Sequence, residues 1–227
     1  MINILLFDID GTLLLSGGAG NRAMDRVFLH LYDIPEVTKG CDFSGMTDPA
    51  ILRDLFLRFR GRDCTARELE QMKESYLRFL GAEVESSPGF RVLPGVLGLL
   101  EELSKRKDVL SGIATGNLER GAQVKLRKAC LASYFRFGGY GSDSEDRPTI
   151  VSLAVERAKN LLGGPSDSHM AFVIGDTPLD IQAGKAAGTL TVAIASGNKP
   201  YEELKSHQPT YLFRDLSPTE EFLRILS

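Results

Sequence analysis

The feature that most constrains the fold is a regular alternation of short apolar runs and amphipathic segments in the second half of the chain. Apolar runs at residues 109–114, 171–174 and 191–195 predict buried strands, and a helically spaced segment follows each of them. Shorter runs at 135–138 and 211–213 predict a fourth strand and an edge strand. Parallel strands need crossover connections, which are usually helices. The alternation therefore predicts an α/β fold with a doubly wound parallel sheet and helices on both faces.

The first part of the chain has a different organisation. Residues 2–7 form an apolar run typical of a fully buried strand, but from about residue 21 the apolar residues recur at helical spacing, with no convincing strand between them. This spacing predicts three or four helices. We therefore expect an α/β core domain made of residues 1–15 and 89–227, with an all-helical cap domain of residues 16–88 inserted after the first strand.

Glycine, serine and proline cluster at residues 15–17 and 86–89, where hinges between cap and core are expected. The predicted helices of the core are 94–107, 119–129, 148–162, 178–187, 201–206 and one that begins at Pro218. A helical insertion at the first strand is best interpreted as a lid over the carboxyl end of that strand.

Composition excludes several classes of protein. The 227 residues are 43% hydrophobic and 25% charged, with a net charge of −3, so no basic field recruits nucleic acid or an anionic membrane. The three cysteines form no C-x-x-C pair, which argues against a disulfide framework or structural zinc. No apolar stretch approaches the roughly 18 residues of a membrane span, and Asp8 interrupts the first apolar run too early for a signal peptide. A cytoplasmic monomer or homodimer is expected.

Two aspartates stand where the first predicted strand ends. Residues 8–13 read DIDGTL and directly follow the apolar run. Alternate side chains of a strand point to the same face, so Asp8 and Asp10 would share a face while the strand lasts. Close carboxylates repel each other, and a divalent cation removes that cost. The pattern favours a site that binds a divalent cation and attacks phosphorus. The alternative is an ordinary acidic turn, in which Asp and Gly are also common.

A second strand end carries polar residues. Ligands of open α/β sheets bind beyond the carboxyl ends of the strands, and the strand at 109–114 is followed by Thr115, Gly116 and Asn117. A hydroxyl and free backbone N–H groups at this place can hold phosphate oxygens. A Thr-Gly-Asn turn is also a common way for a strand to end, so this signal is weak by itself.

A third strand end adds two more aspartates. Asp176 follows the strand at 171–174, where it can complete a magnesium site with Asp8. Thr177 can cap the next helix, with a proline at its first position. Asp180 then falls on the third helical position, where a carboxylate also suits the helix dipole. A structural role is therefore as well supported for Asp180 as a role in the site.

Residues 8–13, 115–117 and 175–180 together resemble, in order, three of the four motifs of the haloacid dehalogenase superfamily of phosphatases. The chain is similar to the phosphoglycolate phosphatase-like branch, which carries a helical cap after the first motif. The resemblance covers nearly the whole chain; the first and last motifs are specific in combination, and the middle one is loose. It implies a Mg²⁺-dependent phosphatase of a small phosphorylated metabolite, with 2-phosphoglycolate as the default substrate.

The resemblance also implies residue roles. Asp8 would attack phosphorus and become an aspartyl phosphate, and Asp10 would protonate the leaving oxygen and then activate water. Asp8, the backbone carbonyl of Asp10 and Asp176 would bind Mg²⁺, supported by Asp180. Such a division suits phosphoryl transfer, which depends mainly on positioning and on neutralisation of charge.

The phosphoryl group would be held by Thr115 and the amides of residues 116–117. Here the chain departs from the family, which usually has a lysine before the helix that precedes the last motif. Arg147 stands at that place and can grip phosphate with two parallel hydrogen bonds, although it differs from lysine in shape and reach. The alternatives are that Arg147 is solvated and that another cation, such as Lys128 or Lys185, reaches the site.

Other functions of the same superfamily remain open. A phosphomutase of the β-phosphoglucomutase type shares these motifs, and a non-catalytic protein that binds a phosphorylated ligand would share the fold. Asp10 argues against a haloalkanoate dehalogenase, and a phosphonate hydrolase would need a cap lysine, for which Lys39 is the nearest candidate. In the cap, residues 45–48 resemble a loop of this branch, although Asp48 followed by Pro49 equally predicts a helix start.

Overall fold

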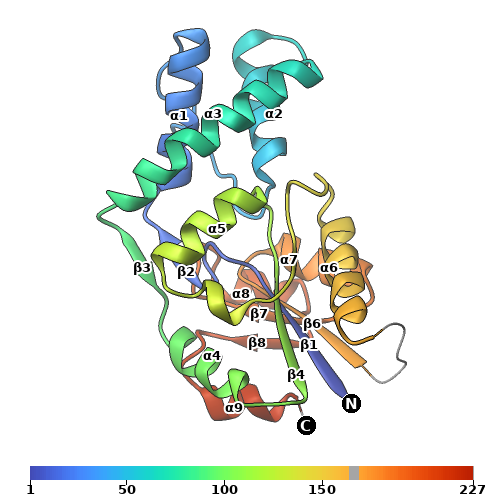
Figure 1. Ribbon diagram of the computed structural model, residues 1–227. Helices are drawn as coiled ribbons and strands as arrows, with labels where there is room; N and C mark the ends of the chain where they lie inside the picture. The colour runs from blue at the N-terminus through green and yellow to red at the C-terminus, as the bar shows by residue number, and fades with distance from the viewer. Residues whose placement is uncertain (164–168, 227) are drawn as a thin grey trace.

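A six-stranded parallel sheet forms the centre of the molecule (Figure 1). The computed structural model describes residues 1–163 and 169–226. The strands follow the order β5-β4-β1-β6-β7-β8, and every neighbouring pair is parallel. Their bounds are β1 Ile2–Phe7, β4 Val109–Ala114, β5 Gly138–Gly139, β6 His169–Gly175, β7 Leu190–Ile194 and β8 Tyr211–Phe213. The doubly wound α/β fold is therefore confirmed.

Helices cover both faces of this sheet. They are α4 Val96–Ser104, α5 Glu119–Lys128, α6 Arg147–Leu161, α7 Pro178–Ala186, α8 Tyr201–Ser206 and α9 Thr219–Arg224. Leu5 and Phe7 of β1 belong to the apolar cluster that includes α4, α5 and α9, whereas Ile4 and Leu6 pack with α6 and α7. Because both faces of β1 are covered, the strand is a continuous apolar run rather than an alternating one.

Three helices between β1 and β4 form a block with an apolar cluster of its own. These are α1 Ala19–Tyr32, α2 Asp48–Arg60 and α3 Ala66–Glu85, and Val27, Phe56 and Met72 are among the residues buried between them. In Figure 1 the block stands above the sheet, at the end where α5 begins. Its separate cluster agrees with the expected all-helical unit.

Two short strands connect this block to the sheet. β2 (Leu14–Ser16) pairs antiparallel with β3 (Phe90–Val92), joining segments that lie more than 70 positions apart in the sequence. The chain thus crosses between the helical block and the sheet twice, and we call these two connections the crossings. The Ser87 side chain donates a hydrogen bond to the Ser16 carbonyl (2.8 Å), which links the two crossings to each other. Hinges were predicted here but the strands were not, because each of these strands pairs with a partner that is distant in the sequence.

Two predicted elements were wrong in extent. The strand predicted at 135–138 is instead the two-residue β5, Gly138–Gly139, which pairs with the end of β4. The helix predicted at 94–107 begins only at Val96, since Gly95 adopts a positive φ of 79° and lies outside it, and it ends at Ser104. A side chain at Gly95 would overlap the backbone of Leu216, so tertiary packing sets this boundary.

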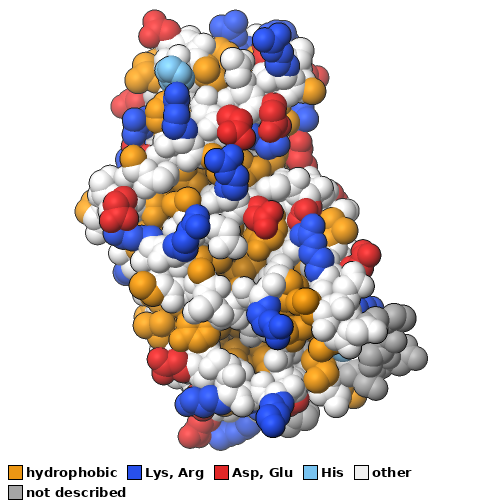
Figure 2. All heavy atoms as spheres, viewed as in Figure 1, with side chains coloured by type: hydrophobic (Ala, Val, Ile, Leu, Met, Phe, Trp, Pro, Cys, Tyr) orange, Lys and Arg blue, Asp and Glu red, His pale blue; other side chains and the backbone are white. Residues whose placement is uncertain are grey.

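The visible surface carries no field of one sign. On the face shown in Figure 2, acidic and basic side chains are interspersed over the helical block and the core. None of the helices in the described ranges is long and apolar enough to cross a membrane.

Candidate active site

Three buried carboxylates converge at the carboxyl ends of β1 and β6. Asp8, Asp176 and Asp180 are 6%, 4% and 2% exposed. Each offers an oxygen, and the three oxygens lie within 4.8 Å of one another. Hard divalent cations prefer carboxylate oxygens, so this donor set fits Mg²⁺. The predicted convergence of Asp8 and Asp176 is therefore observed.

Glycines make room for Asp176. A Cβ at Gly11 or at Gly197 would overlap the Asp176 carboxylate, so both loops contact it through bare backbone. Gly11 also adopts a positive φ of 86°, which glycine tolerates best. The Thr12 hydroxyl donates to Oδ1 of Asp176 (3.2 Å), which fixes the orientation of the carboxylate.

Asp180 has a structural role and a place in the site at the same time. Its Oδ2 accepts hydrogen bonds from the Thr177 backbone N–H (3.0 Å) and hydroxyl (2.6 Å), which closes the capping box of α7. Its Oδ1 forms an ion pair with Arg147. Both interpretations of the sequence therefore apply to this residue.

Crowding of these acids shows in their pKa values. Burial, and then the negative charge of Asp180, raise the pKa of Asp8 to about 7, against the opposing charge of Arg147. Burial and the charges of Asp180 and Asp8 raise the pKa of Asp176 well above its ordinary value. A bound cation would relieve this repulsion, so the electrostatics of the cluster also suit a metal.

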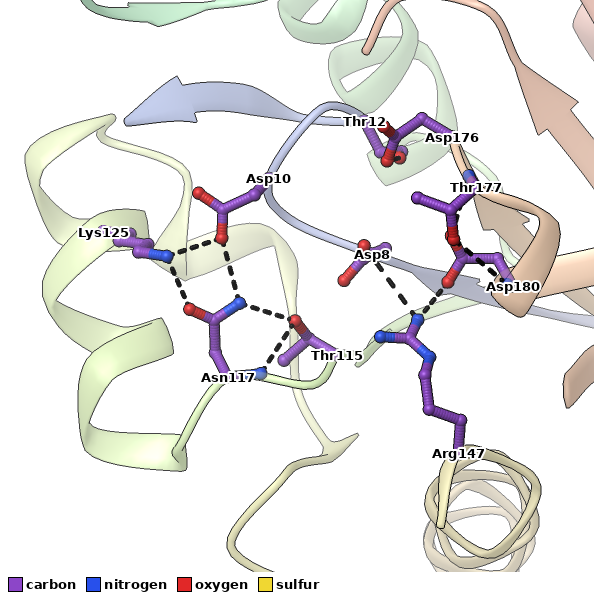
Figure 3. Close-up of polar contacts among 10 residues, drawn as sticks. All are labelled: Asp8, Asp10, Thr12, Thr115, Asn117, Lys125, Arg147, Asp176, Thr177 and Asp180. Carbon is purple, nitrogen blue, oxygen red and sulfur yellow. Dashed lines mark hydrogen bonds and ion pairs between the residues drawn. The ribbon is translucent and has the colours of Figure 1, made fainter. Parts of the chain in front are cut away.

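Arg147 lies inside the site. It is the first residue of α6, after Asp146, whose side chain caps the helix. Its side chain is 11% exposed, and a guanidinium nitrogen lies 4.0 Å from Oδ2 of Asp8, in addition to the ion pair with Asp180 (Figure 3). The solvated alternative for Arg147 is therefore wrong.

The two alternative lysines lie elsewhere. Lys128 forms an ion pair with Glu85 (2.8 Å), and Lys185 donates to the backbone carbonyl of His207 (2.7 Å). Lys39, the candidate for a phosphonate hydrolase, is 77% exposed and paired with Glu36. None of these three side chains lines the cavity at Asp8.

Asp10 points to a different side of the site from the other acids. β1 ends at Phe7, so the strand alternation that would have kept Asp8 and Asp10 on one face does not reach them. Oδ2 of Asp10 accepts hydrogen bonds from Lys125 (2.5 Å) and from Asn117 (3.0 Å), as Figure 3 shows. Packing around Asp10 raises its pKa, but the Lys125 charge and these hydrogen bonds outweigh it, and the net pKa is lowered.

The end of β4 is held by its own side chains. Thr115 is fully buried, and its hydroxyl oxygen accepts hydrogen bonds from the backbone N–H (3.3 Å) and the side-chain amide (2.9 Å) of Asn117. Gly116 allows the helical block to approach, because a Cβ there would lie 2.5 Å from the carbonyl oxygen of Met46. Its own carbonyl accepts from the Asp48 backbone N–H (2.8 Å).

Asp48 joins the block to the core through its side chain as well. It begins α2, as the Asp-Pro pattern predicted, and its Oδ2 accepts from the Leu118 backbone N–H (2.8 Å) at the start of α5. The Tyr76 hydroxyl donates to the other oxygen (3.4 Å). Burial raises the pKa of Asp48 to about 6, although Lys125 and the Leu118 amide oppose the rise.

A cavity of about 440 Å³ lies between the block and the strand ends. Its floor includes Asp8, Asp10 and Asp176, and its roof includes Met24, Phe43, Met46, Ile51 and Tyr76. The predicted position of the helical block over the carboxyl end of β1 is thus observed. A site of this kind can hold a small polar molecule beneath an apolar cover.

Comparison with known proteins agrees with this geometry. The family model described as "Haloacid dehalogenase-like hydrolase" matches residues 5–194. The chain belongs to this family. The sequence resemblance is thereby confirmed at the level of the family.

Individual relatives are distant. The chain is 28% identical to "Pyrophosphatase PpaX" of Bacillus pumilus, over 95% of this chain and 94% of that protein. It is 26% identical to "Phosphoglycolate phosphatase" of Pseudomonas fluorescens, over 94% of this chain and 76% of that protein. The crystal structure of a hydrolase from Pseudomonas syringae superimposes with a TM-score of 0.73 at 22% identity and covers both chains completely, which shows a shared fold.

One residue of this haloacid dehalogenase-like site was missed by the sequence analysis. Lys125 is 3% exposed and contacts both Asp10 and Asn117. A signal for it does exist, because Lys125 lies on the same face of α5 as the buried Leu118, Ala122 and Leu126. A lysine within an apolar stripe needs a buried partner, but the sequence alone does not say which one.

Proposed function

We propose that the protein is a Mg²⁺-dependent phosphatase that hydrolyses a small phosphate monoester through an aspartyl phosphate on Asp8. The observation that carries this proposal is the division of the site. Asp8 lies between two acids and a guanidinium, at 4.0 Å from Arg147, while Asp10 is held on another side by Asn117 and Lys125. This arrangement supports the assignment of the nucleophile and the proton donor to two different carboxylates, Asp8 and Asp10.

The reaction we propose has two steps. In the first, an Asp8 oxygen forms a bond to phosphorus while the bond to the leaving oxygen breaks, and Asp10 donates its proton to that oxygen. In the second, water attacks the same phosphorus, Asp10 takes a proton from the water, and Asp8 leaves as a carboxylate. Thr115, the amides of residues 116–117 and Arg147 would hold the phosphoryl oxygens, in fixed positions that need little reorganisation.

The metal part of the proposal rests on the donor set. Asp8, Asp176 and the backbone carbonyl of Asp10 would hold Mg²⁺, supported by Asp180. Three buried carboxylates converge here, and burial and neighbouring negative charge raise the pKa values of two of them, Asp8 and Asp176, so the set suits a divalent cation better than a vacant acidic cluster. When bound, the cation neutralises charge on the phosphoryl oxygens and on the attacking carboxylate.

The helical block would select the substrate. We propose that residues 16–88 form a mobile cap over the core of residues 1–15 and 89–227, and that the leaving part of the substrate carries an anionic group. The two relatives compared above are named for pyrophosphate and phosphoglycolate, which share this property. Arg91 of β3 lines the cavity and has no carboxylate partner among the described residues, so it is free to receive such a group.

Turnover of p-nitrophenyl phosphate tests the proposal directly. We expect activity with Mg²⁺, none after exhaustive chelation with EDTA, and recovery when Mg²⁺ is restored. Asp8→Asn should remove nearly all activity while leaving the fold intact, whereas Asp63→Asn, at an exposed position far along the cap sequence, should behave as wild type. A folded Asp8→Asn variant with wild-type turnover would refute the mechanism.

A panel of phosphorylated metabolites then identifies the substrate. We expect the highest kcat/KM for small esters or anhydrides with a second anionic group, 2-phosphoglycolate being the first to assay. Arg91→Ala should raise KM for substrates that carry a second anionic group and leave KM unchanged for phosphate esters whose leaving group is uncharged. If Arg91→Ala raised KM equally for substrates with and without the second anionic group, the role of Arg91 would be contradicted, but the phosphatase activity would not. Transfer of phosphate to a sugar instead of water would identify a phosphomutase.

A further inference from the structure

Lys125 is a buried ionisable group that takes no part in the two steps proposed above. It lies on α5 with 4% of its side chain exposed. Taking a charged ammonium out of water costs free energy unless the charge is paired and its hydrogens are bonded. A salt bridge to a carboxylate at the surface would avoid most of this desolvation cost. Because Lys125 is buried instead, the identity of its partners matters.

The partners of Lys125 are residues of the site. Its Nζ donates to Oδ2 of Asp10 (2.5 Å) and to Oδ1 of Asn117 (2.6 Å). The Asn117 side-chain amide donates to the same oxygen of Asp10 (3.0 Å), so the three side chains close a triangle, visible in Figure 3. Two donors that converge on one oxygen restrict rotation of the carboxylate, while 37% of the Asp10 side chain remains accessible.

The same face of α5 also receives the cap. Oδ2 of Asp48 accepts from the Leu118 N–H, and it lies 3.9 Å from the position that a Cβ of Gly121 would take. Lys125 follows Gly121 by one helical turn. Burial lowers the pKa of Lys125, but the charges of Asp10 in the core and Asp48 in the cap outweigh this, so both acids favour its charged form.

We propose that Lys125 is the positioning residue for the proton-transferring carboxylate, and that it holds Asp10 at the leaving oxygen when the cap is seated. The inference rests on the proposed phosphatase function and deepens it. Lys125 contacts no reacting atom; it acts through Asp10, and Asp48 links this arrangement to closure of the cap. An enzyme without Lys125 would keep the nucleophile, the metal ligands and Arg147, but its proton donor would lose its fixed direction.

Leaving-group dependence distinguishes positioning from a general structural role. p-Nitrophenolate leaves with little help from an acid, whereas an alkoxide needs a proton. We therefore expect Lys125→Met to lower kcat for an alkyl phosphate such as glycerol phosphate by roughly a hundredfold, within the range of general acid catalysis, and kcat for p-nitrophenyl phosphate by less than about tenfold. Lys125→Arg should recover part of the loss, because it keeps the charge but not the fit.

Matched controls follow from the structure. Lys128→Met removes a lysine of the same helix that pairs with Glu85 at the surface, and it should change neither substrate. In an Asp10→Asn background, Lys125→Met should produce no further selective loss, because the residue it positions is already gone. If Lys125→Met does not fold, Lys125→Arg is measured alone, and it must still lower the ratio of alkyl to aryl turnover.

The outcomes separate the two proposals. A wild-type protein that turns over neither ester contradicts the phosphatase function itself. Wild-type activity combined with equal losses on both esters in folded Lys125→Met, or with unchanged or faster turnover of the alkyl ester, overturns the positioning role and leaves the function standing.

Discussion

Arg147 is the residue at which this chain differs from the pattern of its family, and the structure gives it a defined place. It contacts Asp180 and lies 4.0 Å from Asp8, so it can balance charge that one Mg²⁺ leaves uncompensated. We expect Arg147→Ala to lower kcat/KM by roughly a hundredfold, the scale of losing one preorganised electrostatic donor. Steady-state kinetics with p-nitrophenyl phosphate measure the effect.

Arg147→Lys is the informative comparison. It should recover part of the activity, but less than all of it, because lysine cannot form two parallel hydrogen bonds to phosphate. Arg157 lies on the same helix, α6, and forms an ion pair with Asp143, which precedes the helix. Arg157→Ala is therefore the matched control. Unchanged kinetics in Arg147→Ala would exclude the residue from catalysis.

Asp8 predicts a pH dependence of metal binding. Its pKa in the metal-free protein is raised from 3.8 to about 7, and only the carboxylate binds Mg²⁺. Below pH 7 the metal must displace a proton from Asp8, and the raised pKa of Asp176 adds a second competing proton, so the Mg²⁺ affinity should fall by at least about tenfold for each pH unit. Isothermal titration calorimetry between pH 5 and pH 8 checks this without relying on activity.

The sign for stability follows from the same shift. The folded metal-free protein binds a proton at Asp8 more tightly than the unfolded chain does, so the Asp8 contribution to stability declines as pH rises from 3.8 toward 7 and does not change further above that range. Asp8→Asn should lose this part of the decline. A Mg²⁺ affinity independent of pH in this range would contradict the raised pKa.

At this scale the sequence predicted the residues that follow strands and missed those that approach from helices. Asp8, Thr115 and Asp176 each stand directly after an apolar run, so the parallel-sheet rule places them at one edge. Lys125 reaches the site across 115 positions from Asp10. No local pattern encodes which carboxylate a buried lysine meets, because that depends on how α5 packs against the β1 loop.

At the scale of elements, the β2–β3 pair, which connects the helical block to the core, is the least predictable part. Gly17 follows β2 with a φ of 60°, and a Cβ there would lie 2.6 Å from a backbone atom of Gly89. Gly17→Ala therefore adds a clash between the two crossings to the cost of positive φ. We expect a loss of roughly 1–3 kcal/mol in the free energy of unfolding, measured by denaturant titration.

Gly40→Ala isolates the backbone contribution. Gly40 has a similar φ of 74°, but a Cβ there would meet nothing within 4 Å. Its substitution should cost only the conformational part, about 1 kcal/mol. Equal losses in the two variants would mean that the approach of Gly17 to Gly89 is not tight in solution.

Helices were easier to predict than these crossings. α8 Tyr201–Ser206 and β8 Tyr211–Phe213 have the bounds that the apolar spacing predicted; α5 and α7 differ from prediction by one residue at one end, and α6 by one residue at each end. Caps and prolines are local signals, which explains the agreement. β2, β3 and β5 depend on partners that are distant in sequence. The bounds predicted for β5 were therefore wrong, and β2 and β3 were not predicted.

At the scale of the whole molecule, several contacts join the helical block to the core, including the ion pairs Arg53–Glu145, Glu74–Arg120 and Glu85–Lys128. Two further contacts lie at separated places. One is the Asp48 contact with α5. The other is an ion pair between Lys199, in the loop after β7, and Asp42 of the segment between α1 and α2 (2.8 Å). The parallel sheet is predicted by the alternation of strands and helices, but these contacts join positions 70 and 157 residues apart and have no signature in the sequence.

A cap that must open for product release should be inhibited by a bond across the second of these contacts. We expect a short bismaleimide that joins Asp42→Cys to Lys199→Cys, in a background with Cys41→Ser and Cys130→Ser, to lower kcat by more than about tenfold, because lid motion limits turnover in many enzymes. Because the cross-link would hold the cap closed over the product, we expect it to slow product release more than the chemical step. Steady-state turnover before and after cross-linking gives the ratio.

The control places the same cross-link inside the cap. Glu36 and Lys39 form an ion pair of similar length (2.9 Å) within the segment after α1, so Glu36→Cys with Lys39→Cys receives the reagent without joining cap to core. That variant should keep its activity. Full activity of the cap-to-core cross-link would show that the cap need not move, and the lid interpretation would fail even though the block covers the strand ends. Loss in both variants would trace the effect to the segment after α1 rather than to opening of the cap.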